Sequence, residues 1–412
     1  MIADLTKSIM RLPLDLSAKG LKYLAEQIVP DENLEDSVGR LVHSAVSLSD
    51  MVSPGLAMGI MREAASSLDE LVPGDSNRLA LLEFQNKLEA FGGFEYVRSM
   101  LDLSPNSGYD LADLVGKAQR LEPYERVWAT EGSGHLYAET YIKRNTIPKN
   151  LLTEESLSPL PPASLITLHA GMGLSLANRV LASVPLTDVP ADLGPLLKRF
   201  LAMCRQNSRD GYAEITIEAL GLVARTLYPG LVHHIDRHLS EHDLDTLSLF
   251  WHGVGRGLYF IPMNFLPYVG SAGRAIEMAV EEAPHSLGRR NAIAGIAWPL
   301  TLVNIRHPEI MENFLASFGN LVQDNDAFSQ GVSTAAMTWF DSVPEDPNLE
   351  AFRAFRPDGE SERVTHVWDD LISRPLEAAI GIHYPVLKAQ WRLGEIFRYQ
   401  PLSRIAARLQ SK

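Results

Sequence analysis

Three pairs of ionisable residues flank glycines at a spacing that suits acid–base chemistry. Both members of each pair face the same side of a helix, because residues four apart lie on one face. Carboxylates and imidazoles are the usual general acids and bases, and a guanidinium beside them would anchor a carboxylate or stabilise developing negative charge. We therefore take both members of each pair as candidate catalytic residues: Glu131 and His135, Asp210 and Glu214, and His252 and Arg256.

The glycines beside these pairs recur along the chain. A glycine followed two residues later by a small residue returns about every 40 residues, which is the signature of a helical-repeat array. Alternating strand patterns are nearly absent. The sequence therefore predicts an all-α protein, either an open α-solenoid or a closed α/α toroid. The repeating pairs are Gly55/Ala57, Gly132/Gly134, Gly171/Gly173, Gly211/Ala213, Gly253/Gly255, Gly295/Ala297 and Gly331/Ser333.

Glycine inside a helix is destabilising by about 1 kcal/mol relative to alanine, so its recurrence needs a reason. We expect the small pairs to let neighbouring helix backbones approach closely. A location at helix starts is a second packing explanation. Neither Gly171/Gly173 nor Gly253/Gly255 predicts a dinucleotide loop, because no strand precedes them and no third glycine sits three residues after the second.

Stacked repeats would bring equivalent positions onto one surface. Besides the ionisable pairs, that surface would carry apolar and polar side chains able to bind a substrate, the usual composition of a small-molecule cleft. The alternative is a structural network in which the same residues bridge neighbouring helices, for example Glu214 with Arg256, and need no ligand. The candidate substrate-binding residues are His169, Leu174, Tyr259, Trp298 and Gln330.

Histidines also raise the question of a metal. Glu131, His135 and Glu139 share a helix face but lack a second ligand-rich helix at matching spacing. His233, His234, His238 and His242 include i, i+4 pairs that could clamp a divalent ion, yet their highly charged surroundings favour a solvated helix end. We predict no metal and no cofactor, and leave open whether the four histidines bind an ion.

Composition limits the class of partner. The 412 residues carry a formal charge of −14 and one cysteine, Cys204. An acidic chain is a poor ligand for nucleic acid, and a single cysteine fits a reducing compartment. The first 22 residues contain Asp4 and Asp15 without a signal-like apolar core, and no apolar run is long enough to span a membrane. We expect a cytoplasmic protein.

Domain organisation follows from the repeat. Residues 1–50 predict an N-terminal helical cap, residues 51–345 the helical-repeat core, and residues 346–412 a C-terminal helical cap. The proline-rich stretch 145–163 predicts a surface loop within the core, because the repeat phase continues through it. The last helix is expected from about Tyr384 to Tyr399.

Four segments between about residues 125 and 340 resemble a bacterial family of unknown function that is often encoded beside enediyne-type polyketide synthases. They are Glu131-Gly132, the run from His169 to Ala177, Asp210-Gly211-Tyr212, and the run from Gly253 to Phe260. The resemblance implies a setting in specialised metabolism of a long apolar polyene or polyyne. It transfers no catalytic residue, and His252 stands where the family carries an acidic residue or glutamine.

Two functions follow from these patterns. The first is a biosynthetic or accessory protein that binds an apolar polyketide-like intermediate, with lyase, cyclase or isomerase chemistry by the candidate catalytic residues. The second is a non-catalytic helical scaffold for a synthase or tailoring enzyme, since helical arrays commonly present large binding surfaces. Convergence of the polar residues on one enclosed site favours the first function, and dispersal over an open face favours the second.

Overall fold

The computed structural model describes residues 74–100, 110–143, 149–153, 160–186, 189–265, 267, 269–323, 325–357 and 362–410. Within these ranges the regular elements are helices, and one isolated β-bridge joins Leu152 to Ser208. The all-α prediction is therefore confirmed. The predicted cap at residues 1–50 and the pair Gly55/Ala57 lie outside the described residues. The other domain boundaries stay predictions.

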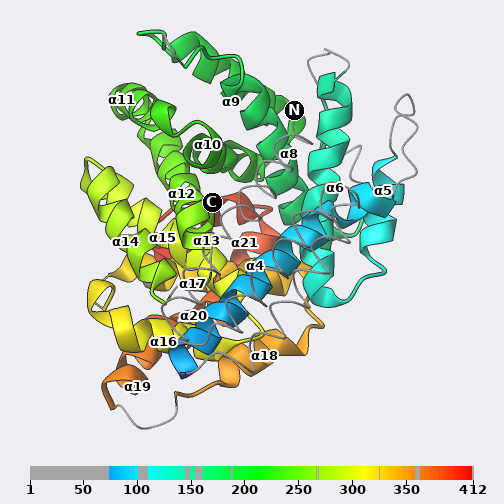
Figure 1. Ribbon diagram of the computed structural model, residues 1–412. Coiled ribbons are helices and arrows are strands. Elements are labelled where there is room, and N and C mark those ends of the chain that lie inside the picture. The colour runs from blue at the N-terminus through cyan, green and yellow to red at the C-terminus, as the bar shows by residue number, and fades with distance from the viewer. Residues whose placement is uncertain are drawn as a thin grey trace, which may run out of the picture.

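A series of long helices forms the body of the molecule, and each contacts the next along the chain (Figure 1). The series is α4 (Asp75–Met100), α6 (Pro123–Lys143), α8 (Leu165–Leu181), α10 (Ala213–Leu227), α12 (Leu244–Phe260), α15 (Ser286–Val303) and α17 (Asp326–Ser342). Contacts also join distant members: α17 touches α8, and α4 touches α15. The ring of Tyr124 at the start of α6 lies 5.7 Å from that of Trp339 on α17.

Shorter helices connect successive members of this series and lie outside it in Figure 1. Pro123 occupies the first position of α6, where its missing N–H is tolerated. The connecting helices are α5 (Leu111–Ala118), α9 (Gly194–Asn207), α11 (Val232–His242), α13 (Pro262–Phe265), α14 (Ser271–Glu282) and α16 (Pro308–Phe318). A further short helix, α18 (Pro347–Ala354), follows α17.

Small residues sit where the long helices cross. A Cβ on Gly171 of α8 would lie 1.8 Å from the carbonyl oxygen of Glu131 on α6, and one on Gly253 of α12 would lie 2.1 Å from that of Glu218 on α10. A Cβ on Gly255 would instead meet Ala292 of α15 at 2.1 Å. Residues two apart point to opposite sides of a helix, so one member of the pair faces the preceding helix and the other the following helix. The prediction of close backbone approach is confirmed.

One predicted pair, Gly211/Ala213, is wrong as a helix-crossing pair. Gly211 has a φ of 77° in the turn before α10, where its missing side chain leaves room for the carbonyl of Trp391. Ala219 and Gly221 take the crossing role within α10: Ala219 meets Gly173 of α8, and a Cβ on Gly221 would lie 1.8 Å from the carbonyl of Phe250 on α12. The crossing pair of α10 therefore lies later in the chain than the repeat pattern predicted.

The C-terminal region runs from α19 (Glu362–Trp368) without a break through η4 (Asp369–Ser373), α20 (Arg374–Ala378) and η5 (Ala379–His383) to α21 (Tyr384–Ala389). The elements η4 and η5 are π-helical, and they end two residues before Pro375 and Pro385, respectively. Proline cannot donate the next helical hydrogen bond, which accounts for the shift of register there.

The helix predicted from Tyr384 to Tyr399 is wrong in its length. It stops at Ala389, and Trp391 adopts a φ of 54° that reverses the chain. The residues that follow form η6 (Leu393–Phe397) and then α22 (Leu402–Gln410), which packs back on α21. We call residues 391–400 the C-terminal strap.

Within the described ranges, no single helix has both the length and the apolar composition needed to cross a bilayer. One bent pair, Ala213–Leu227 with Pro229–His242, reaches those limits together with a bend of 120°.

Candidate functional site

Four charged residues from three helices meet in the interior. The carboxylate of Glu218 on α10 lies 2.8 Å from Nδ1 of His252 and accepts a hydrogen bond of 2.9 Å from Nη1 of Arg256, both on α12. The other guanidinium nitrogen, Nη2, lies 3.8 Å from Oε1 of Glu131 on α6. The exposed fractions of these side chains are 0% for Glu218, 1% for His252, 5% for Arg256 and 9% for Glu131. We call these four residues the charged centre.

The geometry assigns a tautomer to His252 in its neutral form. An ionised carboxylate only accepts hydrogen bonds, so Nδ1 of His252 carries the proton that points to Glu218. The other ring nitrogen, Nε2, then has a lone pair. It is buried, and it has no hydrogen-bond partner among the described residues. A buried imidazole held in one tautomer by a carboxylate is the arrangement of a general base.

Aromatic side chains cover the charged centre. The guanidinium carbon of Arg256 lies 4.3 Å above the ring of Trp298 on α15, within the range of a cation–π contact. The ring of Phe397 in η6 lies 5.8 Å from Trp298 and 6.2 Å from His252. Charges in such an apolar enclosure interact more strongly than they would in water.

Burial shifts the proton affinity of Glu131. Its removal from water raises the pKa, the nearby Arg256 lowers it, and Glu218 raises it again, so that the pKa of Glu131 reaches about 7. Its carboxyl group therefore exchanges its proton near neutral pH, which is where a general acid or base is most effective.

Two further nitrogens of the same region, Nε of Arg256 and Nε1 of Trp298, are buried without a hydrogen-bond partner among the described residues. Leaving such a donor unpaired costs about 1–3 kcal/mol. Buried groups of this kind call for an explanation, such as a bound water, a ligand or a catalytic role.

His135 lies one helical turn from Glu131 but is directed to α8. Its Nδ1 lies 2.7 Å from Oγ of Ser175, and that hydroxyl also donates to the carbonyl oxygen of His135 at 2.9 Å. The hydroxyl proton is therefore engaged, and Nδ1–H of His135 donates to Oγ. This candidate catalytic residue therefore joins α6 to α8 through Ser175.

Asp210 and Glu214 lie apart from the charged centre. Asp210 is exposed in the turn before α10, and half-buried Glu214 in the first turn of α10 lies 3.5 Å from Nη2 of Arg392 in the strap. The expected ion pair of Glu214 with Arg256 does not form, because the displaced phase of α10 puts Glu218 opposite Arg256.

The candidate substrate-binding residues do not all lie at the charged centre. Trp298 belongs to the aromatic cover of the charged centre. Gln330 holds the strap, because its amide donates to the carbonyl of Arg398 at 3.0 Å and accepts from the amide of Gln400 at 2.8 Å. Leu174 is half-buried on α8.

His169 and Tyr259 have structural partners. Nδ1 of His169 donates to the carbonyl of Leu165 at 2.6 Å, and Nε2 accepts from the amide of Arg209 at 3.1 Å. Burial lowers the pKa of His169 to about 4, so this histidine stays neutral at physiological pH. The hydroxyl of Tyr259 accepts a 3.1 Å hydrogen bond from Asn304, and the ammonium of Lys87 lies 4.1 Å above its ring.

The histidines of α11 do not assemble a metal site. His238 and His242 stack with ring centroids 4.5 Å apart, His234 contacts Arg237, and His233 is exposed. In the part of the chain that the structure describes, no group of three or more His, Cys, Asp or Glu residues is arranged to hold a metal ion. Cys204 is buried.

Sequence reasoning missed Glu218 and Phe397. With Ala219 and Gly221 as the crossing pair of α10, Glu218 stands one residue before the first small residue, like Glu131 before Gly132 and His252 before Gly253. The corrected phase would therefore have found it. Phe397 follows the last predicted repeat, and no periodic signal pointed to it.

Comparisons with known proteins do not connect the chain to a relative. No protein-family model, no curated protein and no solved structure matches it. The resemblance of residues 125–340 to an enediyne-associated family stays a prediction.

Proposed function

We propose that this protein is an enzyme whose charged centre performs acid–base chemistry on a small, largely apolar molecule. One observation carries the proposal: Glu131, Glu218, His252 and Arg256 converge from three helices in a buried, aromatic-covered site. Of the polar residues predicted from the sequence, Glu131, His252 and Arg256 converge there, whereas Asp210 and Glu214 lie apart.

Each residue has a role that its contacts suggest. Nε2 of His252 accepts a proton from a carbon or hydroxyl of the substrate, and Glu218 stabilises the imidazolium that forms, as a carboxylate does beside a catalytic histidine. Glu131 in its protonated form gives a proton to a second atom of the substrate. Arg256 stabilises negative charge that develops between the two transfers.

This division of labour suits a reaction that moves protons without changing oxidation state. Removing one proton and adding another isomerises a double bond or closes a ring, and removing one while protonating a leaving group is an elimination. An isomerase, cyclase or lyase therefore fits, and the apolar cover from Trp298 and Phe397 suits an unsaturated hydrocarbon portion of the substrate. The proposal that the substrate is a polyene intermediate of specialised metabolism rests on the family resemblance. The proposal that the protein is cytoplasmic rests on its composition.

The alternative is a non-catalytic scaffold that binds a synthase or tailoring enzyme. The observation in its favour is that the ion pairs of the charged centre join α6, α10 and α12 to one another. Such a network can specify helix register without any ligand.

A repeat arrangement is part of the same proposal. The first small residue of α8, α12, α15 and α17 lies against the carbonyl oxygen of Glu131, Glu218, His252 and Ala294, respectively. Each of these four residues directly precedes the first small residue of its own helix, so the crossing is the same each time. We infer a closed α/α ring in which α17 returns to α8 and α6, supported by the contact between Tyr124 and Trp339.

The test combines ligand detection with substitution. Native mass spectrometry of the protein from its producing host should find a co-purifying small molecule, which His252→Ala and Glu131→Gln variants lose while their thermal unfolding stays cooperative. Arg353→Ala, which removes exposed ion pairs with Glu350 and Glu377, is the matched control. Detection of a stoichiometric protein partner and no small molecule would instead support the scaffold function over the enzyme function.

A further inference from the structure

The C-terminal strap places apolar side chains over the charged centre. Leu393, Ile396 and Phe397 in η6 have no exposed surface. The ring of Phe397 lies against Trp298 and His252. A molecule that is to contact Nε2 of His252 from this side must take the place of Phe397.

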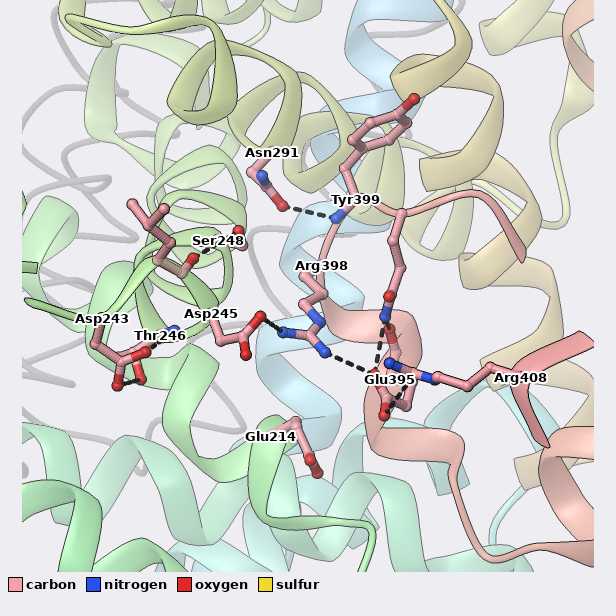
Figure 2. Close-up of polar contacts among 12 residues, drawn as sticks. Glu214, Asp243, Asp245, Thr246, Ser248, Asn291, Glu395, Arg398, Tyr399 and Arg408 are labelled. Carbon is pink, nitrogen blue, oxygen red and sulfur yellow. Dashed lines mark hydrogen bonds and ion pairs between the residues drawn. The ribbon is translucent and has the colours of Figure 1, made fainter. Parts of the chain in front are cut away.

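Besides its buried apolar side chains, the strap is attached to the long helices by polar contacts at its margins. Its backbone binds Gly211, Asn291 and Gln330, through hydrogen bonds of 2.9 Å from Gly394, 2.6 Å from Tyr399 and 2.8 Å from Gln400. Arg398 pairs with Asp245, whose side chain is 89% exposed (Figure 2). Exposed ion pairs contribute little to stability because water solvates the separated charges.

Within itself the strap is held tightly. Glu395 accepts hydrogen bonds from Arg398 and, from α22, Arg408 (Figure 2). It also accepts hydrogen bonds from Arg392 and Gln400. Charge-assisted hydrogen bonds are among the strongest in proteins. The strap therefore keeps its own shape when it separates from α10, α12, α15 and α17.

The ends of the strap suit a hinge. Trp391 has a φ of 54°, an unfavourable conformation for a bulky residue, and Pro401 follows the other end. The side chain of Trp391 stacks under the guanidinium of Arg209 at 3.8 Å and is 39% exposed, so it can reorient without opening the core.

We propose that residues 391–400 are a hinged cover of the charged centre, which opens as a unit at Trp391 and gives a small molecule access to Trp298 and His252. The purpose of the cover rests on the proposed function, but the opening itself does not. Proteins open locally, in contiguous units, with free energies below that of global unfolding.

Thiol labelling measures this opening. In a Cys204→Ala background, Ile396→Cys places a thiol under the cover, and Met337→Cys places one on α17; both native side chains have no exposed surface. With iodoacetamide under native conditions, we expect position 396 to react about a hundredfold faster than position 337 or more. Its rate should also depend only weakly on urea, because local opening exposes little surface.

A second substitution tests the attachment. Gln330→Ala removes two hydrogen bonds to the strap, so it should speed labelling at position 396 on the order of tenfold. Arg353 pairs with Glu350 and Glu377, which lie outside the strap, so Arg353→Ala should leave that labelling rate unchanged. Equal rates at positions 396 and 337 with the same urea dependence would overturn the cover, because both sites would then open only by global unfolding.

Hydrogen exchange on the unsubstituted chain covers the case in which Ile396→Cys fails to fold. The amides of Gly394, Tyr399 and Gln400 should exchange faster than those in the middle of α12 and α15. If no catalysis is detected but these amides exchange fast, the proposed function is wrong and the proposed cover stands. If these three amides exchange as slowly as the helix amides, the proposed cover is wrong and the proposed function is unaffected.

Discussion

The imidazole Nδ1 of His252 on α12 lies 2.8 Å from the carboxylate Oε1 of Glu218 on α10, and neither side chain has more than 1% of its surface exposed. The second oxygen of the same carboxylate binds Arg256, one helical turn further along α12. Glu218 therefore both sets the tautomer of His252 and compensates the buried charge of Arg256. This double use makes Glu218 the residue on which the stability and the proposed chemistry of the charged centre depend together.

The first prediction concerns the removal of that carboxylate. Glu218→Gln should lower the free energy of unfolding by about 3–5 kcal/mol, because it leaves a buried guanidinium without its counter-charge. Urea unfolding followed by circular dichroism measures the loss. In a double-mutant cycle with His252→Phe, we expect a coupling of about 1–3 kcal/mol. Additive effects would mean that the two side chains do not interact in solution.

The second prediction is a pH dependence that comes from Glu131. Its pKa rises from 4.5 to about 7 on folding, chiefly through burial. The folded state thus binds this proton more tightly than the unfolded chain, so the stabilisation is complete below pH 4.5 and is lost as the pH rises to 7. The free energy of unfolding should fall by up to about 3 kcal/mol across this window.

Glu131→Gln is the control for that measurement, since the amide keeps the shape and has no proton to exchange. The difference in unfolding free energy between the native chain and this variant should change between pH 4.5 and 7 with the stated sign. A difference that stays constant over the window would show that folding does not raise the pKa of Glu131.

The third prediction tests the close helix crossing. Gly253→Ala should destabilise the protein by at least about 2 kcal/mol, because the added Cβ would lie 2.1 Å from the carbonyl oxygen of Glu218. The matched control is Gly116→Ala on exposed α5, where nothing lies within 4 Å of the added atom. That change should stabilise by about 0.5–1 kcal/mol through helix propensity. Equal effects at both positions in thermal unfolding would contradict close packing as the reason for Gly253.

The fourth prediction concerns acid stability and the strap. Burial alone would raise the pKa of Glu395, but hydrogen bonds from Arg392, Gln400 and Arg398 outweigh it and bring the pKa to about 2. A depressed carboxyl pKa stabilises the folded state above pH 4.5, and that contribution is lost as the pH falls from 4.5 to 2. We expect it to be about 2 kcal/mol after allowance for solvent.

Glu395→Gln should remove this contribution, so the native chain and the variant should converge in unfolding free energy near pH 2. The exchange rates of the amides of Gly394 and Tyr399 should rise in the variant at neutral pH. An unfolding difference that persists at pH 2 would assign the effect to packing instead of charge.

The helical class, the small-residue pairs and three members of the charged centre could be predicted from the sequence. These features depend on spacing within one helix: Glu131 precedes Gly132, and His252 and Arg256 flank Gly253 on one face of α12. Spacing of this kind is local, because the 3.6-residue turn alone decides which side chains share a face. The reason for the glycines was also accessible, since an unfavourable residue inside a helix implies a neighbouring backbone.

Only the tertiary structure decided which helix supplies the partner of each charge. Gly211 and Ala213 matched the sequence pattern as well as Ala219 and Gly221 did, and the wrong pair was chosen as the crossing pair of α10. Asp210 and Glu214 were therefore predicted in place of Glu218. The choice depends on which residues of α10 meet Gly173 and Gly253 at the crossings. Phe397 follows the same logic, because its contact with His252 joins residues 145 positions apart through the turn at Trp391. Packing between helices selects such contacts, and periodicity along one helix carries no information about them.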